Sequence, residues 1–153
     1  MESRQLFARP EMWARSGPEM ESVAGGRLRD LCYLDDRDDE YEHLRESLRR
    51  FGKLGVHGPF AATFGVDGRC TAEVASVYAE LYHRFGYLPV ERQLDTDEWL
   101  PLTRVREWAG DRDFRRSEVE AAFGTPSLRV GTRVSCYAPA DQGPWVFFDT
   151  WDE

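Results

Sequence analysis

The sequence predicts one α+β domain over residues 1–153, with helices packed on one face of a mainly antiparallel sheet. In 38–51 and 71–85, apolar side chains recur three and four positions apart, which is the spacing of one helix face. Near the C-terminus, 128–138 alternates apolar and polar residues, and 145–151 is rich in aromatic residues. Both patterns are typical of strands, and together they predict a C-terminal β-hairpin.

The N-terminal half is predicted to hold an irregular segment followed by two helices. Glycines and prolines interrupt residues 1–30, so we expect this segment to pack irregularly on the rest of the domain. The segment 38–51 begins with acidic residues and ends with arginines, which suits the dipole of a helix. The segment 71–85 has the widest apolar stripe and is the expected core helix. That stripe consists of Val74, Val77, Tyr78, Leu81, Tyr82 and Phe85.

The C-terminal half is predicted to add two helices before the hairpin. Thr96 is the expected N-cap of a helix over 96–109. Ser117 is the expected N-cap of a shorter helix, which Gly124 ends. The segment 139–144, which contains two prolines and a glycine, predicts the loop of the hairpin.

The charge of the chain narrows the class of partner. There are 20 basic and 28 acidic residues, and the net charge is −8. Nucleic acids and membrane surfaces repel an anionic protein, so we expect neither as a partner, whereas a basic protein partner is compatible. Aromatic residues make up 13% of the chain, and disordered chains contain few of them, so the chain is expected to fold.

The cysteines and the termini indicate the compartment. Cys32, Cys70 and Cys136 form no paired motif, so we expect neither a disulfide framework nor a metal site or other cofactor. The N-terminus lacks the apolar run of a signal peptide, and no segment approaches membrane-spanning length. A cytoplasmic location is therefore expected. Lys53 is the only lysine, and this preference for arginine indicates a GC-rich bacterial genome.

A serine-led helix, a glycine–any residue–proline step and an aromatic hairpin follow one another near the C-terminus. The residues that fit this order are Ser117, Val119, Phe123, Gly124, Pro126, Tyr137 and Trp145. The pattern resembles the helix–hairpin unit of the SmpA/OmlA-type outer-membrane-assembly lipoproteins and the repeats of beta-lactamase inhibitory protein. The resemblance implies a curved sheet that docks other proteins.

The hairpin also predicts the residues that would contact such a partner. Alternation separates the face with Arg129, Arg133 and Tyr137 from the face with Leu128, Val130, Val134 and Cys136, which we expect to face the helices. An arginine opposite Asp149 would satisfy its carboxylate, and arginine and aromatic side chains dominate binding hot spots. The predicted partner-binding residues are Arg129, Arg133, Tyr137, Trp145, Asp149 and Trp151.

One cysteine provides an alternative, catalytic interpretation. Cys70 follows an arginine at the start of the predicted core helix, a position that lowers the pKa of a thiol. The segments 68–90 and 145–150 resemble the cysteine helix and the tryptophan-to-aspartate segment of transglutaminase-like hydrolases. The resemblance implies a nucleophilic Cys70, and the alternative catalytic interpretation adds His57, which lies upstream of both segments. That family has its histidine between the two segments, and here no histidine follows His83, so we expect Cys70 to be structural.

An acidic run occupies residues 35–40. Asp39 and His43 stand one helical turn apart, which is a spacing of metal ligands, but no second ligand pair accompanies them. We therefore expect a solvated helix start. The functional alternative is an acidic patch that binds a basic partner.

Three functions follow from these observations. The leading one is a small intracellular, non-catalytic binding protein, such as an inhibitor or immunity-type protein, that docks a larger protein through an aromatic and arginine-rich sheet face. The chain shows no complete catalytic set, which favours this function over the others. The alternatives are a cysteine hydrolase or transferase that uses Cys70, and a structural subunit of a larger assembly.

Overall fold

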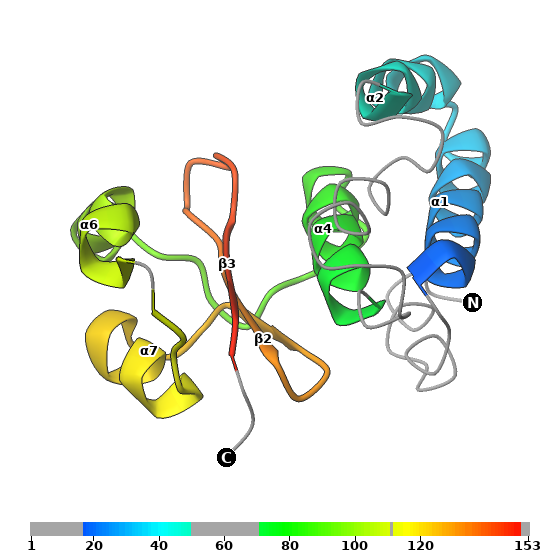
Figure 1. Cartoon of the computed structure of the whole chain (residues 1–153). Coiled ribbons are helices and arrows are strands. Elements are labelled where there is room, and N and C mark those ends of the chain that lie inside the picture. The colour runs from blue at the N-terminus through cyan, green and yellow to red at the C-terminus, as the bar shows by residue number, and fades with distance from the viewer. Residues whose placement is uncertain (1–16, 50–70, 111, 151–153) are drawn as a thin grey trace. The chain divides into compact units, whose positions relative to one another are not determined.

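A computed structural model describes residues 17–49, 71–110 and 112–150. The chain divides into two compact units, Met1–Leu88 and Pro89–Glu153, and each has its own set of elements (Figure 1). The α+β class and the antiparallel sheet near the C-terminus are confirmed. The single domain over 1–153 stays a prediction. Within the described ranges, no helix is long and apolar enough to cross a membrane.

The first described element of the first unit is a helix, where the sequence predicted an irregular segment. Helix α1 spans Gly17–Leu34, so the expectation for 1–30 is wrong over its described part. A Cβ atom added to Gly25 would lie 3.1 Å from the Tyr78 hydroxyl of helix α4 (Thr71–Arg84). The glycine that suggested a break in the sequence instead permits a close approach of two helices.

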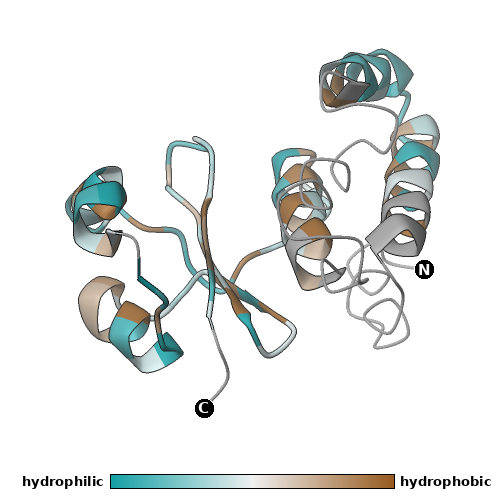
Figure 2. Ribbon diagram, viewed as in Figure 1, coloured by the Kyte–Doolittle hydropathy of each residue, from teal (hydrophilic) through white to brown (hydrophobic). Residues whose placement is uncertain are grey.

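Helices α2 (Asp38–Arg49) and α4 both pack against α1 and lie close to their predicted positions. Figure 2 shows apolar residues along α4 and a mostly hydrophilic α2. The buried residues of α4 are Val74, Ala75, Ser76, Tyr78, Ala79, Glu80, Leu81 and Tyr82. The prediction that α4 is the core helix of its region is therefore confirmed, with Val77 and Phe85 half-buried beside the stripe.

Tyrosine hydroxyls attach α1 to the rest of its unit. The hydroxyl of Tyr82 in α4 donates to the carbonyl of Ala24 at 2.9 Å, and that of Tyr41 in α2 donates to the carbonyl of Gly25 at 3.2 Å. The hydroxyl of Tyr87, which follows α4, donates to a third carbonyl of α1 at 3.2 Å. Burial raises the pKa of all three phenols, so each stays a neutral donor.

The second unit starts with a broken helical segment. The single helix predicted over 96–109 is instead α5 (Thr96–Trp99), the 3-10 turn η3 (Leu100–Arg104) and α6 (Val105–Ala109). A proline near the start of η3 lacks the N–H that a continuous helix would use. Helix α7 (Arg116–Phe123) follows.

The N-cap of α5 is Asp95, so the prediction of Thr96 is wrong by one residue. The Asp95 carboxylate accepts hydrogen bonds from the backbone N–H groups of Asp97 and Glu98, at 3.0 and 2.9 Å. The Glu98 carboxylate in turn accepts one from the Asp95 N–H at 3.2 Å, which completes a capping box. A carboxylate at this position also favours the positive end of the helix dipole.

The N-cap predicted for α7 is likewise displaced. Ser117 lies inside the helix, on its exposed side, because the helix begins at Arg116. The backbone N–H of Arg115, at the N-cap position, donates to the Glu118 carboxylate at 2.9 Å. This bond and the nearby Arg112 guanidinium lower the pKa of Glu118. The helix start therefore depends on a glutamate in its first turn.

The sheet has three antiparallel strands in the order β1-β2-β3. They are β1 (Leu128–Val130), β2 (Val134–Tyr137) and β3 (Val146–Asp149). The segment predicted as one strand over 128–138 is thus two strands. The chain reverses at Gly131, whose φ of 59° lies in the left-handed region that favours glycine.

Aromatic rings join the sheet to the helices of the second unit, which lie beside it (Figure 1). Phe123 of α7 stacks on Phe148 of β3 with ring centroids 5.2 Å apart, and Tyr137 of β2 meets both rings edge-on. The Tyr137 hydroxyl donates to the carbonyl of Gly124 at 2.8 Å. The buried residues of this core are Leu94, Leu102, Val119, Phe123, Tyr137 and Phe148.

The substitution Leu81→Ala tests the assignment of the core helix. Leu81 is 8% exposed, so its truncation should lower the free energy of unfolding by about 2–5 kcal/mol. Urea unfolding measures this loss. The matched substitution Val77→Ala removes a half-buried side chain from the same helix and should cost less. A loss at Leu81 under about 0.5 kcal/mol, within the range of ordinary surface substitutions, would contradict the assignment.

The substitution Asp95→Ala tests the cap of α5. It removes the acceptor of two backbone N–H groups and should cost about 1 kcal/mol of stability. Thr96→Ala is the matched control and should be nearly neutral, because the capping side chain is that of Asp95. Equal losses for the two variants in urea unfolding would restore Thr96 as the cap.

Candidate functional site

The structure divides the predicted partner-binding residues between two faces of the sheet. The register Arg129↔Ser135 and Ser135↔Phe148 puts Arg129 on the face of Phe148, together with Tyr137. Asp149 pairs with Val134 and therefore belongs to the opposite face. The six residues cannot form one continuous surface on one side of the sheet.

The grouping by alternation is right, and both faces of the sheet contain buried residues. Tyr137 was predicted to face a partner, yet it is fully buried in the core beneath α7. In the opposite set, Val130, Val134 and Cys136 are also buried, as predicted, although they lie outside this core. Alternation could not decide the orientation, because both sets contain large apolar side chains. The Phe148 ring, which pairs with Ser135 on the Tyr137 face, gives that face the larger aromatic contact.

Two further predictions about these residues have different outcomes. The expected arginine partner of Asp149 is confirmed, because Arg133, in the turn between β1 and β2, donates to this carboxylate of β3. Trp145 is 6% exposed, so most of its surface is already buried. Trp151 lies outside the described residues. Binding of a partner by these residues stays a prediction.

No contact between described residues supports the catalytic or the metal-binding interpretation. Cys70 and His57, the alternative catalytic pair, lie outside the described residues. Cys32 is buried, and this burial raises the pKa of its thiol. Among the described residues, no three histidine, cysteine or acidic side chains cluster to hold a metal ion. His43 Nδ1 lies 2.8 Å from the Asp39 backbone carbonyl, so this ring nitrogen is used within α2.

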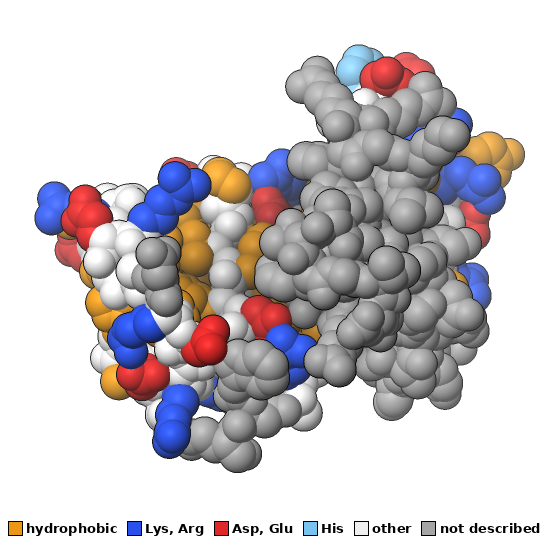
Figure 3. Space-filling view, viewed as in Figure 1, with side chains coloured by type: hydrophobic (Ala, Val, Ile, Leu, Met, Phe, Trp, Pro, Cys, Tyr) orange, Lys and Arg blue, Asp and Glu red, His pale blue; other side chains and the backbone are white. Residues whose placement is uncertain are grey.

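Among the described residues, the turn between α1 and α2 exposes large apolar side chains beside several aspartates. We call it the α1–α2 corner and define it by Tyr33, Leu34, Asp35, Asp36, Asp38 and Asp39. Tyr33 and Leu34 are large and apolar, yet they are 68% and 75% exposed. Figure 3 shows a hydrophobic patch over the end of α1, with acidic and histidine side chains over the neighbouring α2.

The corner departs from ordinary helix-end chemistry. Asp35 and Asp36 follow the C-terminal end of α1, where the helix dipole disfavours negative charge. Asp36 also has a φ of 54°, in the left-handed region that non-glycine residues seldom adopt. Asp38 and Asp39 begin α2, where the dipole favours them. The side chains of Asp36, Asp38 and Asp39 form no ion pair with any other residue that the structure describes.

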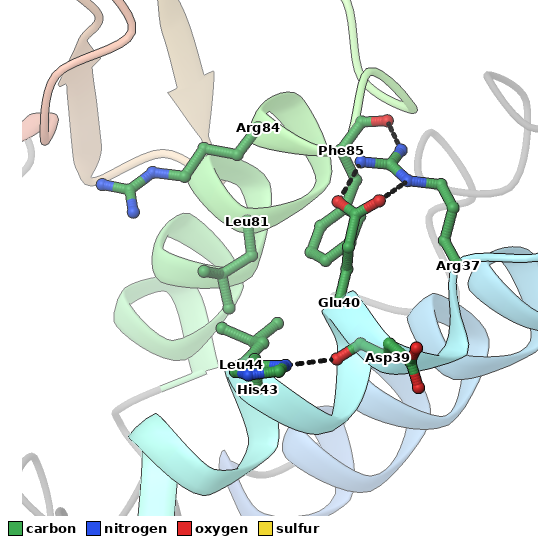
Figure 4. Close-up of a pocket in the computed structure, with 8 residues that line it drawn as sticks. All are labelled: Arg37, Asp39, Glu40, His43, Leu44, Leu81, Arg84 and Phe85. Atoms are coloured by element: carbon green, nitrogen blue, oxygen red, sulfur yellow. Dashed lines mark hydrogen bonds and ion pairs between the residues drawn. The ribbon is translucent and has the colours of Figure 1, made fainter.

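Arg37 lies within this corner and connects it to α4. Its guanidinium donates twice to the Glu40 carboxylate, at 2.9 and 2.7 Å, and once to the Phe85 carbonyl at 2.7 Å (Figure 4). It also lies over the Phe85 ring, 4.7 Å from the centroid. The Arg37 backbone N–H donates to the Cys32 carbonyl at 2.8 Å, near the end of α1. The guanidinium lowers the pKa of Glu40, which therefore stays ionised.

A groove of about 480 Å³ adjoins the corner, between α2 and the end of α4. Leu44 from α2 and Leu81 and Phe85 from α4 and its end line its apolar part (Figure 4). Its polar rim is formed by Arg37, Asp39, Glu40, His43 and Arg84. Arg84 donates to the Glu80 carboxylate one turn before it, which neutralises both charges.

No protein-family model, curated protein or solved structure matches the chain. The resemblance of its C-terminal helix and hairpin to SmpA/OmlA-type lipoproteins and to beta-lactamase inhibitory protein stays a prediction. The roles of the corner and the groove therefore depend on their own residues.

Sequence reasoning noticed the acidic run but missed the apolar pair in front of it. The buried stripe of α1 contains Ala24, Leu28, Leu31 and Cys32. Tyr33 and Leu34 follow this stripe directly, at the end of the helix. Once α1 is recognised, two large apolar residues off its stripe and before four aspartates are a signal of an exposed surface. The assignment of 1–30 as irregular hid this signal.

The substitution Arg37→Ala tests whether this side chain holds the corner in place. It removes a charged hydrogen bond to a backbone carbonyl and should lower the free energy of unfolding by about 1–2 kcal/mol. Arg45→Ala is the matched control. Arg45 pairs with Glu42 on the exposed side of α2, and its loss should cost under about 0.5 kcal/mol. Equal losses for the two variants in urea unfolding would contradict a special role for Arg37.

Proposed function

We propose that this protein is a small non-catalytic binding protein, of the inhibitor or immunity type, that docks a larger basic protein through the α1–α2 corner. The observation that carries the proposal is the exposed pair of Tyr33 and Leu34. Beside it lie aspartates that form no ion pair with any cationic side chain among the described residues. Tyrosine anchors are frequent at the centre of protein interfaces, where polar residues surround them.

The corner retains features that lower the stability of the free protein. Each acidic residue at the C-terminal end of a helix typically costs about 0.3–1 kcal/mol, and Asp35 and Asp36 both have this position. The left-handed conformation of Asp36 adds backbone strain. Departures of this kind concentrate at functional sites, where a partner compensates for them. A basic surface would neutralise these carboxylates.

Charge explains why the partner is expected to be basic. The chain has a net charge of −8, which attracts a cationic protein over distances of about 10 Å at 0.1 M salt. Aspartates at the corner that form no ion pair with another described residue direct this attraction to one place on the surface. Tyr33 and Leu34 then supply the apolar contact that long-range attraction alone does not provide.

A photo-crosslinking residue at position 33 tests this proposal in cells of the native host. Tyr33 should crosslink one main protein, and mass spectrometry should identify it as basic. Leu100 is the matched control, since it is also large, apolar and 58% exposed but lies in the second unit. The same product from position 100, or an acidic product from position 33, would contradict the proposal.

The purified pair then tests the role of charge. The combined change Asp36→Asn, Asp38→Asn and Asp39→Asn should weaken binding by about tenfold or more at low salt and flatten its salt dependence. The matched change of Asp95, Asp97 and Asp113 to asparagine alters the charge equally in the second unit. Equal weakening by the two sets would show that only the net charge matters, and would remove the corner from the proposal.

A further inference from the structure

We infer that the groove between α2 and α4 receives an apolar side chain from a basic amphipathic helix of the partner. This inference rests on the proposed function and adds the kind of segment that the partner presents. The groove is continuous with the α1–α2 corner, because Asp39 belongs to both and Arg37 and Glu40 connect them (Figure 4).

The apolar part of the groove favours an apolar occupant. Leu44, Leu81 and Phe85 face it from two helices, and Leu44 and Phe85 are only half-buried (Figure 4). A volume of about 480 Å³ lies in the range of about 300–1,000 Å³ that binding pockets occupy. Burying a leucine or phenylalanine side chain there would remove its apolar surface from water and favour binding.

The charges on the rim do not favour an ion inside the groove. Glu40 is bound by Arg37, and Arg84 is bound to Glu80, so these charges have counterions, whereas Asp39 at the rim forms no ion pair with another described residue. The Arg84 guanidinium points away from Leu44 and Leu81 (Figure 4). A free anion would have to break one of these pairs, and a cation would meet Asp39 at the rim, whereas an apolar side chain inside the groove leaves both pairs intact.

A helix suits this surface better than an extended strand. Helices α2 and α4 both pack on α1, and a third helix can lie between them by the ridge-and-groove packing of helix bundles. An extended peptide gains affinity mainly from backbone hydrogen bonds to an exposed sheet edge, and the backbone groups along α2 and α4 are bonded within their helices. Lysines or arginines beside the apolar stripe would meet Asp36, Asp38 and Asp39.

Two synthetic helical peptides test this inference with the full-length protein. They carry the same lysines and arginines, and one has a leucine stripe where the other has alanine. Fluorescence anisotropy at low salt should show that the protein binds the leucine peptide about tenfold more tightly, a difference that equals about 1.4 kcal/mol. Leu44→Gln should reduce this ratio toward one. Leu48→Gln, on the next turn of α2 and outside the groove, should leave it unchanged.

A second variant guards against simple loss of folding. His43→Trp fills the groove from its exposed rim and should also remove the preference, with circular dichroism confirming that the helices persist. Equal binding of both peptides by the unmodified protein, or equal effects at Leu44 and Leu48, would overturn the inference. The asparagine variant of Asp36, Asp38 and Asp39 separates the two proposals. Weaker binding of both peptides with an unchanged ratio supports the corner, whereas unchanged binding of both contradicts it.

Discussion

The Arg37 guanidinium joins the start of α2 to the end of α4, and the corner and groove of the first unit both depend on this contact. Helix α2 is mostly hydrophilic and presents only half-buried apolar residues, so burial alone holds it weakly. The bonds from Arg37 to Glu40 and to the Phe85 carbonyl set the distance between the two helices. A lysine at this position would keep the charge but could not make the paired bonds to Glu40 and the bond to the carbonyl together.

In both units, tyrosine hydroxyls satisfy backbone carbonyls of helices or helix ends, but the positions of these carbonyls differ. In the first, hydroxyls from Tyr41, Tyr82 and Tyr87 bind carbonyls along α1, so that the rings pack while their polar ends are satisfied. In the second, Tyr137 binds the carbonyl that follows α7, and burial raises the pKa of its phenol to about 12. A neutral phenol at a helix end satisfies a carbonyl without bringing a charge into the core.

Sequence patterns predicted the elements that have one clear apolar face and failed where a residue type had two meanings. Helix α4 was predicted from its stripe, and the pairing of Asp149 with an arginine followed from the cost of leaving a carboxylate unpaired. Gly25 suggested a break in the helix, but it lies where α1 packs closely against α4. The segment around Gly131 was predicted as one continuous strand, but the chain turns there. The faces of the sheet could not be oriented from alternation, because both are apolar. For the candidate site, the acidic run was visible, but the exposure of Tyr33 and Leu34 depends on where α1 ends.

The reversal at Gly131 also decides which backbone groups of the sheet remain open to another molecule. Because the chain turns there, β2 becomes the central strand and bonds on both sides, while β1 is an outer strand of only three residues. The other outer strand, β3, ends at the charged Asp149. Short outer strands and charges at their ends limit edge-to-edge pairing between sheets. A continuous strand through this position would have offered a longer edge, so the turn at Gly131 reduces the length of strand that another sheet could pair with.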